Sequence, residues 1–167
     1  MSRHHQLKEV NSPNEFAQLS NSRRIFALLA LIVAGESIFF LPFVLPRVFR
    51  PTILEVFGLT NTELGAAMAA YGFVAMVAYA LGGPLADFFC PRKLLAIALV
   101  STSLGGIVLW QVPALATLKS LYAYWGFTTI ALFWAALIRA TRQWGGKLAQ
   151  GTAFGLLEGG RGLLTAV

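Results

Sequence analysis

Residues 64–85, LGAAMAAYGFVAMVAYALGGPL, run without a single charged side chain. An α-helix needs about 20 mostly apolar residues to cross the roughly 30 Å hydrocarbon layer of a bilayer, so this stretch predicts a membrane-spanning helix. Its apolar side chains follow one another instead of alternating with polar ones, and the run is too long for a strand. A membrane β-barrel, built from alternating strands of about ten residues, is therefore excluded.

Runs of similar character occupy much of the remaining chain. Hydrophobic residues make up 57% of the sequence and charged residues 12%, whereas soluble domains are about one quarter charged. The first run contains one charge, Glu36. We predict an all-α membrane protein with four complete transmembrane helices and a partial fifth, at about residues 25–45, 64–86, 94–112, 121–138 and 151–167.

The cations of the chain are concentrated in alternate turns between these helices. Nine of them lie in residues 3–24, 92–93 and 139–147, whereas the intervening turns hold Arg47, Arg50 and Lys119. Short loops rich in Lys and Arg face the cytoplasm, so we predict a multi-pass protein of the cytoplasmic membrane with its N-terminus inside and residues 1–23 as a polar cytoplasmic tail. The net charge of +6 then reports topology and contact with membrane lipid, not nucleic-acid binding.

The turn after the second helix carries an unusual pattern. Residues 82–95 read GGPLADFFCPRKLL, with a lone aspartate, a proline and two adjacent cations between apolar runs. This pattern resembles the cytoplasmic signature loop of the major facilitator superfamily, in which glycine, a small residue, aspartate and basic residues follow at fixed spacing. Phe88 stands where that family usually has a cation, and Cys90 where it usually has glycine.

A second resemblance to the same superfamily covers residues 125–157. It consists of Gly126, the stretch Phe133-Trp134-Ala135-Ala136, Trp144 and a glycine-rich start to the next helix. The resemblance implies that residues 24–167 are an incomplete N-terminal transmembrane domain, whose partner is a missing C-terminal half. It further implies a secondary transporter that moves a small solute by alternating access, and we expect the fragment to be inactive alone.

The resemblance also implies a role for one charge cluster, which would latch the cytoplasmic face in one conformation and release it in the other. A loop that only fixes topology is the alternative. The proposed cluster comprises Gly83, Asp87, Arg92, Lys93 and Arg139.

Three charges fall within apolar runs and are candidates for a substrate or proton pathway. Glu36 lies in the middle of the first run, where a carboxylate must be protonated, paired or hydrated, so coupling to protons is one hypothesis and a neutral packing role another. Glu158 and Arg161 share a helix face at i and i+3, which also allows a purely structural pair. Gly151, Gly155 and Gly159, spaced by four, predict a smooth strip for helix packing.

No pattern indicates an enzyme, a cofactor or a metal site. The chain has one cysteine, no phosphate-binding loop and no nucleophile with a matching base. His4 and His5 lie in the polar tail and make a poor ligand set by themselves. The alternative to a transporter is a membrane scaffold or accessory subunit that binds partners through its glycine-rich helix faces.

Overall fold

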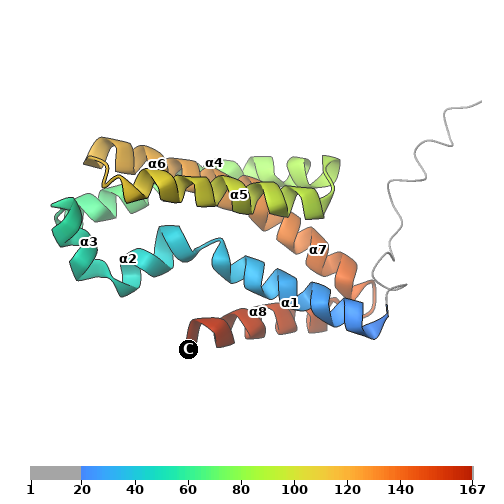
Figure 1. Cartoon of the computed structure of the whole chain (residues 1–167). Helices are drawn as coiled ribbons and strands as arrows, with labels where there is room; N and C mark the ends of the chain where they lie inside the picture. The colour runs from blue at the N-terminus through green and yellow to red at the C-terminus, as the bar shows by residue number, and fades with distance from the viewer. Residues whose placement is uncertain (1–19, 167) are drawn as a thin grey trace, which may run out of the picture. The chain divides into compact units, whose positions relative to one another are not determined.

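The computed structural model describes residues 20–166 (Figure 1). The described residues form helices and turns, without a strand. Four helical stretches are long and apolar enough to cross a membrane: residues Asn21–Val48, Asn61–Phe88, Pro91–Trp110 and Leu115–Gly145. The prediction of an all-α membrane protein is therefore confirmed, while most of the predicted polar tail lies outside the described residues.

The chain divides into two compact units. The larger unit is Ala34–Arg139, and the smaller one combines the residues up to Val33 with those from Ala140 onward. The boundaries fall within two helices, α1 (Asn21–Ser37) and α7 (Ala135–Gly145).

The first span is interrupted after α1. A π-helical turn, η1 (Phe40–Val44), and a single turn of α-helix, α2 (Leu45–Val48), complete it. Pro42 lies inside η1 and has no amide hydrogen to donate, so the regular hydrogen-bond ladder cannot pass through this position. The short helix α3 (Arg50–Phe57) follows and ends at Gly58, whose φ of 61° requires the left-handed region that glycine adopts without cost.

Helix α4 (Asn61–Phe88) contains the charge-free stretch from which the fold was predicted. It begins with a capping box: the Thr60 side chain accepts a hydrogen bond from the Glu63 amide, and the Glu63 carboxylate accepts one from the Thr60 amide. This polar cap extends the helix three residues beyond the predicted start. The buried side of α4 repeats every three or four residues, as one face of a helix does; its members are Leu64, Ala67, Tyr71, Ala75, Ala78, Gly82 and Ala86.

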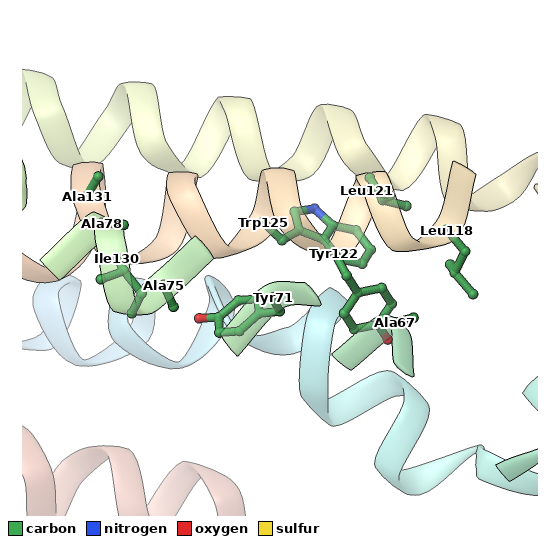
Figure 2. Close-up of a cluster of buried hydrophobic side chains, with 10 residues drawn as sticks. All are labelled: Ala67, Tyr71, Ala75, Ala78, Leu118, Leu121, Tyr122, Trp125, Ile130 and Ala131. Atoms are coloured by element: carbon green, nitrogen blue, oxygen red, sulfur yellow. The ribbon is translucent and has the colours of Figure 1, made fainter. Parts of the chain in front are cut away.

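The core of the larger unit forms where α4 meets two further helices. Helix α5 (Pro91–Trp110) begins at the proline expected to start it, and α6 (Leu115–Phe127) lies alongside α4 and α5 (Figure 1). A second π-helical segment, η2 (Thr128–Trp134), joins α6 to α7 within the fourth span. Figure 2 shows the buried cluster at this junction: Ala67, Tyr71, Ala75, Ala78, Leu118, Leu121, Tyr122, Trp125, Ile130 and Ala131.

In the smaller unit, α8 (Gln150–Ala166) packs on the first part of α1. The closest approach is at Gly160, where an added Cβ would lie 2.5 Å from Cδ1 of Ile32. A turn at Gly146, with φ 60°, leads from α7 into α8. Gly145, the last residue of α7, packs against Ala153 in α8, where an added Cβ would lie 2.8 Å from Cβ of Ala153. Glycine therefore permits both the turn and the helix contact in this unit.

Candidate functional site

Buried hydroxyl groups link the three packed helices of the larger unit. The hydroxyl oxygens of Tyr71 in α4 and Thr129 in η2 lie 2.7 Å apart, and Thr129 also donates to the main-chain oxygen of Trp125 at 2.7 Å. All three residues are buried. Since a polar group buried without a partner is costly inside a membrane protein, this pairing holds η2 against α4 in one register.

A second set of contacts joins η2 to α5. The hydroxyl oxygens of Thr102 and Thr128 are 2.8 Å apart, and the indole Nε1 of Trp125 donates to the main-chain oxygen of Thr102 at 3.0 Å. The α5 backbone is close enough for this bond because position 105 is glycine: a Cβ there would lie 2.4 Å from the indole nitrogen. The sequence analysis did not predict Thr102, Thr128 or Thr129 as site residues, because each lies inside an apolar run. The one local sign of a polar contact was that Thr128 and Thr129 are adjacent.

A cleft of about 300 Å³ adjoins Thr102. Its polar lining residues are Ser37, Thr102 and Ser103, which come from the end of α1 and from α5. The apolar lining is Ile38, Leu41, Leu99 and Val100. The cleft therefore offers hydroxyl groups inside an otherwise apolar wall, which is the composition typical of a small-molecule site.

Glu36 precedes Ser37 in the sequence and is not one of the residues that line the cleft. It is half-buried, it occupies the last turn of α1, and the Phe39 amide donates to its main-chain oxygen at 3.2 Å. The π-helical turn η1 begins four residues later. The predicted pathway carboxylate thus stands beside the interruption of the first span, a relationship that apolar run length alone does not reveal.

Arg139 is the member of the predicted charge cluster that contacts the end of α4. Its guanidinium donates to the main-chain oxygens of Ala86 and, at 3.3 Å, Phe89, so it caps the C-terminal end of α4. Asp87, Arg92 and Lys93 are exposed, and within the described residues no salt bridge joins Asp87 to Arg139. Gly83 has open space around it; its neighbour Gly82 is the glycine that packs, with an added Cβ 3.3 Å from Cβ of Ala135.

The remaining candidates lie on α8. Arg161 NH1 donates to both carboxylate oxygens of Glu158 at 3.1 Å, with Glu158 exposed and Arg161 largely covered. Gly151, Gly155 and Gly159 have no atom of the described residues within 4 Å of an added Cβ. This face of α8 is therefore open within the described part of the chain, and Gly160 is the glycine that contacts α1.

The described residues contain no group of three or more His, Cys, Asp or Glu side chains placed to hold a metal ion. His4 and His5 lie outside the described residues.

Comparison with known proteins places the chain beside bacterial membrane proteins. It is 31% identical over 143 residues to "Inner membrane protein YqcE" of Escherichia coli (strain K12), an alignment covering 86% of this chain and 34% of that protein. It is 32% identical over 143 residues to "Inner membrane protein YihN" of the same strain, covering 86% and 33%. The chain thus spans about a third of the length of these relatives.

A more distant relative comes from another bacterium. The "Uncharacterized protein MG294 homolog" of Mycoplasma pneumoniae is 27% identical over 151 residues, which cover 81% of this chain and 31% of that protein. No protein-family model matches the chain, and no solved structure matches it.

The assignment to the major facilitator superfamily is therefore corrected. The two Escherichia coli relatives are named only as inner membrane proteins, and no family model supports the superfamily. The resemblance rested on short patterns in residues 82–95 and 125–157. The contacts of Arg139 have a simpler reason, because a cation that caps exposed carbonyls is favourable at the C-terminal end of any helix. The latch role that the resemblance implied for this turn loses that support.

Proposed function

We propose that this chain is part of a bacterial inner membrane protein that carries a small solute across the bilayer, with its N-terminus on the cytoplasmic side. The observation that supports it best is the interrupted first span, in which Glu36 immediately precedes the break and Ser37 begins the adjoining cleft. Spans interrupted by non-α-helical turns are typical of solute sites in transporters, and ionisable residues within spans are functional by default.

The chemistry of the cleft points to a small solute that forms hydrogen bonds. Ser37 and Ser103 carry hydroxyl groups at this cleft, and a hydroxyl can both donate and accept; the Thr102 hydroxyl is paired with that of Thr128, and Ser103 donates to the main-chain oxygen of Val100. Glu36, one residue before Ser37 in α1, is a carboxylate within the first span, so proton coupling is part of the proposal. The π-helical segments η1 and η2 are the places where the first and fourth spans would bend as access alternates.

Uptake into proteoliposomes tests this function. The longest natural chain that contains these residues is reconstituted, and a panel of radiolabelled sugars, amino acids and organic acids is offered with and without an imposed pH gradient. We expect saturable accumulation of one class of solute, and loss of its pH dependence in Glu36→Gln. The 167-residue chain alone is expected to be inactive. No saturable uptake of any solute would contradict transport, whereas unchanged pH dependence in Glu36→Gln would contradict only the coupling.

A second candidate, a scaffold or accessory subunit, is favoured by the open glycine faces. In addition to the α8 strip, Gly65, Gly72 and Gly83 on α4 have no described atom within 4 Å of an added Cβ. Small residues allow another helix to approach closely in a membrane. Replacing Gly72 or Gly155 by Leu and measuring recovery of cross-linked partners from native membranes tests this role, since the variants lose partners only if these faces bind them.

A further inference from the structure

Arg24 and Trp144 hold each other in the smaller unit. The indole Nε1 of Trp144 donates to the main-chain oxygen of Arg24 at 2.7 Å, and the Arg24 guanidinium carbon lies 5.2 Å from the centre of the Trp144 ring. A cation at this distance over an indole face is attracted by the π-electrons. The start of α1 and the end of α7 are therefore joined at this pair, and the guanidinium is fixed in position.

Within the described residues, few of the donors of this guanidinium have a hydrogen-bond partner. An arginine side chain carries five N–H donors, yet the recorded side-chain bond of Arg24 is one long contact of 3.5 Å from NH2 to the main-chain oxygen of Trp144. Its Nε is buried and has no hydrogen-bond partner within the described residues, so an incoming anion would meet the terminal NH1 and NH2 groups instead. A guanidinium that is already held in place and has free N–H donors is well placed to bind an oxyanion, because the side chain loses little conformational freedom when the anion binds.

Three more cations surround the pair along the chain. Arg23 precedes Arg24, Arg142 lies two residues before Trp144 and Lys147 three after it, and all three are exposed. The one acidic side chain among the described residues of this unit is Glu158, which is paired with Arg161. Within the described residues of this unit, the cations at this end therefore outnumber the carboxylates.

The position of the pair identifies the kind of anion. Arg24 is three residues after the start of the first candidate span, and Trp144 is one residue before the end of the fourth. Span ends lie at the headgroup level of a bilayer, where tryptophan is enriched and where lysine and arginine meet lipid phosphates. We propose that Arg24, supported by Trp144, Arg23, Arg142 and Lys147, binds the phosphate of an anionic phospholipid. This site is independent of transport.

Lipid retention measures this directly. The full chain is placed in nanodiscs of equal parts phosphatidylglycerol and phosphatidylcholine, released in the mass spectrometer, and the lipids that remain bound are counted. We expect wild type to retain phosphatidylglycerol preferentially. An interfacial cation contributes about 1 kcal/mol to attraction toward anionic lipid, so Arg24→Gln should lower the preference about fivefold. Arg24→Lys, which keeps the charge but loses the planar donors, should fall between.

Arg47→Gln is the matched control, since it removes one exposed cation from the larger unit. Arg142→Gln and Lys147→Gln alter exposed side chains, so they test the site even if Arg24→Gln fails to fold. Equal retention of the two lipids by wild type, or equal effects of Arg24→Gln and Arg47→Gln, would overturn the proposal. Displacement of the bound lipid by millimolar inorganic phosphate would also overturn it, because the site would then serve a soluble anion.

Discussion

The main chain of α6 at Gly126 lies directly against the carbonyl oxygen of Tyr71 in α4. A Cβ added to Gly126 would be 2.6 Å from that oxygen and 3.3 Å from the amide nitrogen of Ala75. Both are backbone atoms of a long helix, so they cannot swing aside as the tip of a side chain can. Gly126 therefore sets the distance between α4 and α6, and with it the packing of the core in the larger unit.

Replacement of Gly126 by alanine should destabilise the protein. The added methyl group must push two backbones apart, and overpacking of this kind costs about 1–3 kcal/mol. The measurement is the midpoint of thermal unfolding in detergent. Gly72→Ala on α4 is the control, because its Cβ meets nothing within 4 Å and glycine is the poorer helix former. Equal midpoints for the two variants would show that the helices are not in close contact at Gly126.

The hydroxyl pair of Tyr71 and Thr129 should give a measurable coupling energy. Tyr71→Phe and Thr129→Val each remove one hydroxyl, and the double variant removes both, so the cycle isolates their interaction. Hydrogen bonds between membrane helices average about 0.6 kcal/mol, which is the coupling we expect. Tyr122→Phe combined with Thr129→Val serves as the control, because no hydrogen bond joins that pair, and its effects should add. An additive Tyr71 cycle would contradict the described bond.

Loss of Arg139 should loosen the last turn of α4. Its guanidinium donates to the main-chain oxygens of Ala86 and Phe89, and these carbonyls have no other helical partner at the end of the helix. In Arg139→Gln we expect faster hydrogen exchange of the amides in residues 85–89, with Arg139→Lys closer to wild type because it retains a cation. Lys93→Gln, an exposed cation at the same turn, should leave exchange unchanged. Similar exchange in the Arg139 and Lys93 variants would argue against capping.

Filling the cleft should block uptake without unfolding the protein. Ser37 is exposed and lines the cleft, so Ser37→Phe places an aromatic ring where we propose the solute binds. We expect a severalfold rise in the KM of whichever solute is transported, with the thermal midpoint unchanged. Val77→Phe, at an exposed site on α4 that does not line this cleft, is the control. A normal KM in Ser37→Phe would place the solute elsewhere.

Run length and charge were enough to predict the helical spans, because crossing hydrocarbon requires about 20 apolar residues whatever the neighbours are. They did not predict where each helix ends. Asn61 and Gly145 belong to spans although polar residues flank them, since a cap or a solvated turn continues a helix beyond the hydrocarbon layer. Pro42 is visible in the sequence, but the sequence alone did not show that the missing amide hydrogen at this position leads to a π-helical turn in the folded chain.

The site was harder to predict than the fold. Gly82 and Gly83 are adjacent and chemically identical, but they face different directions on α4, and only the first meets a neighbour. Thr102, Thr128 and Thr129 form hydrogen bonds between elements distant in sequence, and no local pattern reports such pairs. Glu36 was recognisable because a carboxylate within an apolar run is rare. Its place beside a helix break required coordinates.

The second π-helical segment, η2, also changes the directions in which side chains of the fourth span point around the helix axis. A π turn takes up more residues than an α turn, so side chains beyond η2 are rotated relative to those before it. A single helical wheel drawn through Leu115–Gly145 would therefore assign the wrong azimuth to half of the span. In a cysteine scan of this span, helical-wheel positions should therefore be assigned separately for the residues before η2, counted from Gly126, and for those after it, counted from Ala135.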